Sequence, residues 1–152
     1  MEYRNHFYIT LFSNASQKAY PKNTLAEFTI QLAQRIDLGS TDNWEVGLSE
    51  FSCPPPKSGT LRPIEVVGDT NTLIYCDLIT PQFVGDDYVR CLRTFIRPSK
   101  YCEHTFQNVY YVPVQKRSFQ DITILIKDLN GNHVPFKDGT VPTKLVLHFR
   151  RV

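Results

Sequence analysis

Apolar and polar residues alternate one by one along several segments, and this period of two most restricts what the chain can fold into. Successive side chains of a β-strand point to opposite faces, so alternation predicts strands with one buried face, whereas a helix repeats every 3.6 residues. The clearest runs lie at 24–33 (Phe28, Ile30, Leu32), 44–49 (Trp44, Val46, Leu48), 119–127 (Ile122, Ile124, Ile126) and 144–150 (Leu145, Leu147, Phe149).

Other segments indicate strands more weakly. The run 7–12 is rich in aromatic and β-branched residues, which favour strands, and further candidates are Ile64–Val67, Leu73–Ile79, Val89–Ile96 and Thr105–Val112. Leu25–Arg35 contains helix formers, but its apolar spacing is two, so we expect a strand there too. The sequence therefore predicts about eight or nine short strands and no helix.

Turn residues separate these runs. Ten prolines disfavour long helices, and Pro54-Pro55-Pro56 predicts a rigid extended loop. Asn130-Gly131 predicts a hairpin with a type I′ turn, since that turn needs positive φ at both central residues. Asp138-Gly139 predicts a second turn before the last strand. We see no linker, and many short strands without a repeat predict an antiparallel β-sandwich or barrel.

Composition agrees with one domain over residues 1–152. Of the residues, 41% are hydrophobic and 21% charged, which is typical of globular chains. The net charge of +2 does not indicate a nucleic-acid or membrane-surface protein. No apolar run reaches the ~18 residues of a membrane helix, and the start lacks the pattern of a secretory signal. We therefore expect no membrane span and no specific nucleic-acid partner.

Four scattered cysteines, Cys53, Cys76, Cys91 and Cys102, are expected to be reduced thiols, because we expect no export and the chain is large enough to fold without disulfides. Cys76 lies in an apolar run, where a thiol acts as a small hydrophobe. Cys102 and His104 form at most a two-ligand fragment, which is weak support for a metal site. We expect no bound metal or cofactor.

No catalytic motif is found, so we expect a protein that is not an enzyme. Asp77, inside an apolar run, is either a perturbed acid or, more simply, a residue that faces solvent or caps a neighbouring turn. Asp86-Asp87 follow Gly85, but one pair of carboxylates supplies too few oxygen ligands for a calcium ion. His148 beside Arg150 is expected at a surface or interface. We predict no catalytic, cofactor-binding or metal-binding residues.

Basic residues form two small clusters, Lys116-Arg117 and Arg150-Arg151. Because Tyr110-Tyr111 lie near the first cluster, a nucleic-acid-binding surface remains possible. A simpler explanation is that the charges lie on a solvated strand edge and discourage aggregation there. The aromatic content of 12% suits a two-sheet core and protein–protein interfaces.

Particular strings resemble the penton, or minor capsid, proteins of Polinton (Maverick) elements and the related adintoviruses. They occur in the family's order along nearly the whole chain, at 7–16, 20–24 with Phe28, 44–48, 74–79, 81–86 with Leu92-Arg93, 109–114, Phe119, Asp121-Ile122, Ile124, Ile126, Asp128, Gly131, 134–136, Gly139 and 147–151.

The resemblance implies a single jelly roll, that is, two antiparallel four-stranded sheets in a sandwich. It implies homopentamers at the five-fold vertices of a virion, surrounded by a double-jelly-roll major capsid protein and assembled inside the host cell. The alternating residues Trp44, Val46, Leu48, Ile122, Ile124, Ile126, Leu145, Leu147 and Phe149 are then core, while Gly47, Gly131 and Gly139 serve backbone geometry.

Two alternatives remain open beside the penton. One is a major capsid subunit that forms a small shell alone, and the other is a jelly roll that binds a receptor or a carbohydrate. For a penton, we expect subunit contacts from the loops Cys53–Arg62 and Pro98–His104, with Tyr101. Lys116, Arg117, Arg150 and Arg151 are candidates for pairing with acids on a neighbour.

Overall fold

The computed structural model describes residues 5–55, 71–96, 102–137 and 141–152. The expected strand Ile64–Val67 and the expected turn at Asp138-Gly139 lie outside these residues. Across the described residues the chain forms β-strands and no helix, which confirms the all-β prediction. The strands are β1 His6–Phe12, β2 Glu27–Asp37, β3 Trp44–Cys53, β4 Asn71–Cys76, β5 Gln82–Val84, β6 Asp87–Val89, β7 Cys91–Ile96, β8 Cys102–Thr105, β9 Tyr111–Pro113, β10 Ser118–Lys127 and β11 Lys144–Arg151.

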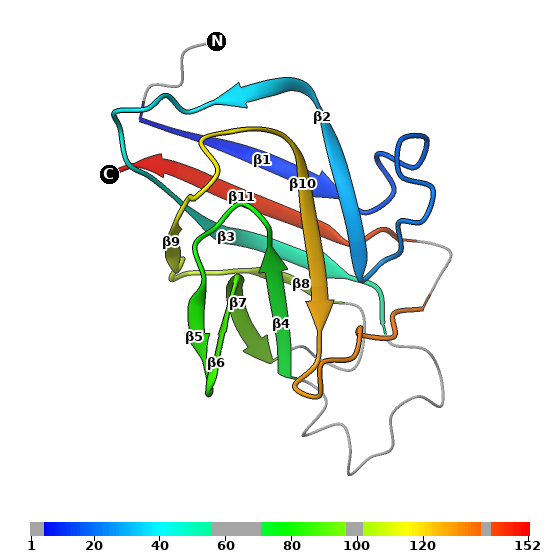
Figure 1. Cartoon of the computed structure of the whole chain (residues 1–152). Coiled ribbons are helices and arrows are strands. Elements are labelled where there is room, and N and C mark those ends of the chain that lie inside the picture. The colour runs from blue at the N-terminus through cyan, green and yellow to red at the C-terminus, as the bar shows by residue number, and fades with distance from the viewer. Residues whose placement is uncertain (1–4, 56–70, 97–101, 138–140) are drawn as a thin grey trace.

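Two antiparallel sheets face each other (Figure 1). The first has the order β1-β11-β3-β8, with β9 also paired to β3, and the second has the order β2-β10-β4-β7. Because β8 and β9 pair with successive parts of β3, five strands fill four positions in the first sheet. Successive strands alternate between the sheets except from β4 to β7, where the separate hairpin β5–β6 is inserted, and from β8 to β9, which share one position beside β3.

The core lies between the sheets and is formed by the residues that the alternation indicated. All nine of them are buried, with Trp44 4% exposed and Ile122, Leu147 and Phe149 fully buried. Phe119 is also buried, although it is three residues from Ile122, because the register with β2 shifts between Phe119 and Asp121. The alternation along β10 is interrupted at this irregularity, and both side chains face the core.

Three expected strands are divided or shortened in the structure. Thr105–Val112 is divided, because the segment between β8 and β9 leaves the sheet and lies over Gly47, where an added Cβ would be 2.3 Å from Cγ1 of Val109. Leu73–Ile79 ends at Cys76, and Ile79 forms an isolated bridge to Val114. Val89–Ile96 is interrupted at Arg90, between β6 and β7.

The turn at Asn130-Gly131 exists, but the type I′ prediction is wrong. Gly131 has φ +82°, while Asn130 keeps a negative φ. The Asp128 side chain accepts hydrogen bonds from the amides of Asn130 (2.9 Å) and Asn132 (3.0 Å), and Lys127 forms a bridge with His133. The carboxylate of Asp128 therefore organises a wider turn that needs only one left-handed residue.

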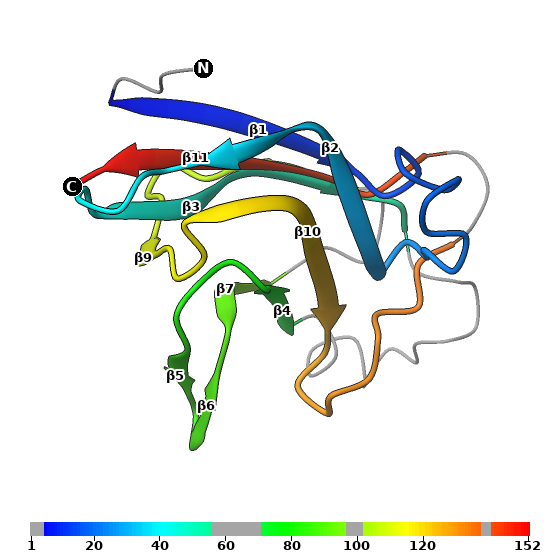
Figure 2. The same ribbon diagram turned by 45° about the horizontal axis from the view of Figure 1, so that its top comes forward.

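The connections gather at two ends of the sandwich. At one, the Ser13 end, Ser13 N donates to Thr143 O (2.9 Å) and Lys137 N donates to Pro55 O (2.7 Å). At the other, the Leu38 end, Leu38 N donates to Arg117 O (2.8 Å) and Gln115 N donates to Leu78 O (2.7 Å). Figure 2 shows that the β5–β6 hairpin extends away from the two sheets. In the described part of the chain no helix has the length and apolarity to span a membrane.

Candidate interaction surfaces

The two basic clusters meet at the Leu38 end, around Asp42. Arg117 donates to the backbone oxygens of Asp42 and Gly39, and Nε of Arg151 lies 3.5 Å from the Asp42 carboxylate. Arg150 pairs with Glu45. These three arginines, which were predicted to bind acids on a neighbouring subunit, already have partners in their own chain. Pairing with a neighbour therefore requires an exchange of partners and stays a prediction.

Asp77 has a structural role. Its Oδ1 accepts the amide of Thr123 (2.9 Å), and its Oδ2 accepts Nζ of Lys116 (3.1 Å). The carboxylate therefore joins the end of β4 to β10. It also gives Lys116, the fourth cation predicted to bind a neighbouring subunit, a partner within its own chain. This geometry supports the interpretation of Asp77 as a cap rather than as a catalytic acid.

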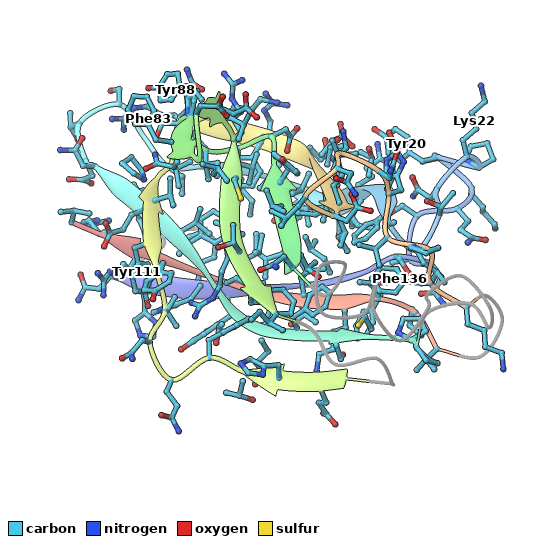
Figure 3. All side chains as sticks on the ribbon, turned by 90° about the horizontal axis from the view of Figure 1, so that it is seen from below. Tyr20, Lys22, Phe83, Tyr88, Tyr111 and Phe136 are labelled. Atoms are coloured by element: carbon cyan, nitrogen blue, oxygen red, sulfur yellow. The ribbon has the colours of Figure 1, made fainter. Side chains whose placement is uncertain are left out.

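A row of rings crosses the outer face of the first sheet. Tyr8 on β1 stacks on His148 of β11 with ring centroids 4.4 Å apart. On the next strand Gly47 is the register partner of both His148 and Tyr111. Because Gly47 has no side chain, the Tyr111 hydroxyl reaches Nδ1 of His148 at 2.7 Å. Figure 3 shows Tyr111 at the edge of this sheet.

His148 also lies 3.1 Å from Nδ1 of His6, and Arg150 lies over the Tyr111 ring at 3.4 Å. Burial lowers the pKa of His148, and the neighbouring His6 and Arg150 lower it further. The expected surface position of His148 is confirmed, but the imidazole is half-buried and hydrogen-bonded rather than free in solvent.

The β5–β6 hairpin carries an exposed aromatic pair. Phe83 and Tyr88 face each other across its two strands, with ring centroids 4.7 Å apart. They are 82% and 61% exposed. Gly85 takes φ +61° at the tip, where Asp86 and Asp87 are also exposed. The sequence does not reveal this hairpin, because strands of three residues are too short to show an alternation.

An open groove of about 360 Å³ lies on the outer face of the second sheet, beside this hairpin. Its walls include Tyr75, Tyr88, Arg90, Thr123 and Leu125. Cys76 also borders the groove, and burial raises the pKa of its thiol to about 12. A thiol with such a pKa stays protonated at neutral pH and does not act as a nucleophile.

Other candidate residues are not brought together as a site. His104 packs against Phe106, with ring centroids 4.4 Å apart, while Cys102 is the register partner of Cys53. Within the described residues no group of three His, Cys, Asp or Glu side chains is placed to hold a metal ion. Tyr101 and most of the loop Cys53–Arg62 lie outside the described residues.

The strand order defines a class of fold. Two four-position antiparallel sheets whose strands alternate between them form a jelly-roll β-sandwich, as expected, an architecture that occurs in viral capsid proteins and in lectins. No protein-family model matches the sequence, and no curated protein matches it. Among solved structures, the chain is similar to the crystal structure of the mavirus penton protein, with a TM-score of 0.63, 7% identity, and coverage of 97% of this chain and 100% of that chain. At this identity the likeness establishes the fold.

Proposed function

We propose that the chain is a penton-type minor capsid protein that forms homopentamers at the five-fold vertices of a virion. The observation that carries this proposal is the extent of the structural likeness. It covers 97% of this chain and 100% of the mavirus penton protein, so the likeness extends over the length of both chains rather than over one part of them. The resemblance of the sequence strings to Polinton and adintovirus pentons supports the same conclusion.

On this proposal the function is geometric. The chain closes a vertex, makes contacts to copies of itself, and makes further contacts to a double-jelly-roll major capsid protein around it. Cyclic contacts beyond a dimer are heterologous, so each subunit must present two different and complementary patches. The inner faces of both sheets are buried in the core. The loops, the strand edges and the outer faces of the sheets are therefore the surfaces left for these contacts.

Size-exclusion chromatography with light scattering tests the oligomer. Five subunits of 17.6 kDa give a particle of about 88 kDa, provided that the ring closes with five-fold symmetry. Negative-stain images of that species are expected to show a five-fold ring. Closed shells formed by the chain alone would instead favour a major capsid subunit.

Co-expression with a double-jelly-roll major capsid protein from the same virus tests the vertex position. We expect the chain at the vertices of the particles, with particles made without it as the control. A chain that stays monomeric at high concentration and does not enter the particles would reject the proposal. Specific glycan binding by such a chain would favour a carbohydrate-binding jelly roll.

A further inference from the structure

The β5–β6 hairpin, residues 82–89, is an acidic aromatic projection. Among the described strands, β5 and β6 pair only with each other. The hairpin contains Asp86 and Asp87 and no basic residue, and neither acid forms an ion pair with a described residue. Isolated two-stranded hairpins are marginally stable in water, and the largely exposed Phe83 and Tyr88 are side chains that interfaces bury at their centres.

The segment 13–24, which we term the lysine loop, has the opposite charge. It contains Lys18 and Lys22 and no acidic residue. Both lysines are exposed, and neither is ion-paired within the described part of the chain. Tyr20 lies between them, and the hydrogen bond of its hydroxyl to Asp121 raises the Tyr20 pKa.

The lysine loop is held in a defined conformation on the edge strand β2. The Asn23 amide group donates to Thr29 O and accepts from Thr29 N, both at 2.9 Å. Ser16 Oγ accepts a hydrogen bond from the backbone N–H of Gln31 at 3.0 Å. The backbone N–H of Tyr20 donates to Ser16 O at 2.8 Å. Because these bonds order the loop within the monomer, docking against it costs little conformational entropy.

The hairpin and the lysine loop lie at opposite ends of the molecule. Figures 1 and 2 place the hairpin at the left and the segment between β1 and β2 at the right. Figure 3, turned about the same horizontal axis, likewise places Phe83 and Tyr88 at the left and Tyr20 and Lys22 at the right. The chain therefore carries two different patches of opposite charge, pointing in different directions, as a heterologous contact requires.

We propose that the acidic aromatic hairpin of one subunit docks on the lysine loop of the next copy and that this contact builds the ring. The inference rests on the proposed homopentamer and identifies its contact surfaces. Burial of Phe83 and Tyr88 supplies affinity, while the acids and lysines set orientation and specificity, since exposed ion pairs alone contribute little.

Charge reversal tests the contact in the full-length chain by sedimentation velocity over a concentration series. Asp86→Lys with Asp87→Lys, and separately Lys18→Glu with Lys22→Glu, are each expected to weaken self-association by at least about tenfold, because like charges across an interface are strongly unfavourable. Phe83→Ala with Tyr88→Ala is expected to weaken it as well. The control reversals Glu103→Lys and Lys137→Glu, at exposed positions outside both patches, are expected to leave it unchanged.

Combining both reversals in one chain restores opposite charges and is expected to recover the pentamer. Mixing the two reversed chains gives a different result. Each hairpin then accepts only the other variant as its neighbour, so the two must alternate, and alternation cannot close a ring with an odd number of subunits. The mixture is therefore expected to form open chains or even-numbered rings rather than pentamers.

This inference is overturned by self-association that neither reversal weakens, and equally by a combined variant as weak as each single reversal. Pentamers that persist through both reversals would place the contact elsewhere and leave the proposed function standing. A wild-type chain that stays monomeric would also reject the hairpin contact, while incorporation at particle vertices would still decide the proposed function.

Discussion

At Gly47 a missing side chain organises part of the first sheet. The segment between β8 and β9 crosses directly over this residue, and an added Cβ would lie 2.3 Å from Cγ1 of Val109 and 2.8 Å from the backbone oxygen of Tyr110. Both contacts are shorter than real Cβ contacts. The glycine is required here by close approach of the chain rather than by a positive φ.

We predict that Gly47→Ala lowers the free energy of unfolding by about 1–3 kcal/mol, as overpacking of a filled site does. Chemical denaturation measures the loss. Ser49→Ala on the same strand serves as the control and is expected to behave like the wild type. If Gly47→Ala is as stable as that control, the crossing segment does not lie against β3.

Trp44 is a core residue whose indole N–H finds no acceptor within the part of the chain that the structure describes. The side chain is 4% exposed, and its buried Nε1 has no hydrogen-bond partner among the described residues. We predict that Trp44→Ala costs about 3–5 kcal/mol of unfolding free energy, through lost burial and the cavity left behind. Trp44→Phe keeps an aromatic ring and is expected to lose much less. A Trp44→Ala protein that melts at the wild-type temperature would contradict the assigned strand face.

His148 makes stability depend on pH. Burial first, then His6 and Arg150, lower its pKa in the folded state, so the unfolded chain binds the proton more strongly. Stability is therefore greatest above the ordinary histidine pKa of ~6.5 and falls as the pH drops through that value toward the folded pKa. The other groups facing this ring are Tyr8 and Tyr111, and Glu45 pairs with Arg150.

We predict that the melting temperature falls between pH 7.5 and pH 5.5, and that His148→Gln reduces this fall. His133→Gln is the matched control, because His133 lies outside the ring cluster on the turn after β10. An equal pH dependence in the wild type and in His148→Gln would show that the cluster does not couple protonation to folding.

At the scale of elements, β3 and β8 bring two cysteines into register. Cys53 and Cys102 are Cα partners in this antiparallel pair, and such partners lie within the Cα separation that a disulfide spans. Scattered spacing in the sequence gave no sign of this pairing. Of the four cysteines that are predicted to be reduced, Cys53 and Cys102 are therefore the two placed to form a disulfide.

We predict four free thiols when the chain is denatured without reductant. In the folded protein Cys76 and Cys91 are expected to react slowly at pH 8, since burial raises their pKa values to about 12 and about 11. Thiol titration before and after denaturation measures both. A count of two would indicate a disulfide, and Cys53→Ser would show whether it joins β3 to β8.

At the scale of the whole molecule, one continuous core connects the two sheets. The buried cluster includes Phe28 and Ile122 of the second sheet together with Val46, Leu147 and Phe149 of the first. It also joins residues on both sides of the segment 56–70, which lies outside the described residues. Neither sheet can keep its apolar face buried without the other.

We therefore predict a single cooperative unfolding transition for the chain, with equal calorimetric and van't Hoff enthalpies. Differential scanning calorimetry at a concentration where the chain is monomeric measures it, because self-association would shift the transition. Two separated transitions would contradict the interpretation of residues 1–152 as one domain.

Strand content and the buried faces were available from the sequence alone. Alternation identified β2, β3, β10 and β11 and the nine core residues on the last three, because the side-chain period of a strand depends only on neighbours in the chain. The same locality explains the limits of that reasoning. Short strands such as β5 and β6 contain too few residues to show alternation. The prediction of a type I′ turn was wrong because Asp128 accepts hydrogen bonds that shape the turn, and the Asn-Gly pair alone does not indicate them.

Only the tertiary structure decided which distant residues meet. His6 and His148 are 142 positions apart and share a hydrogen bond, and both basic clusters converge on Asp42. The opposite placement of the acidic hairpin and the lysine loop likewise depends on the order in which the strands pair. Periodicity states which face of a strand is buried, but strand order and register set what lies beside it, because contacts across sheets arise from packing through space.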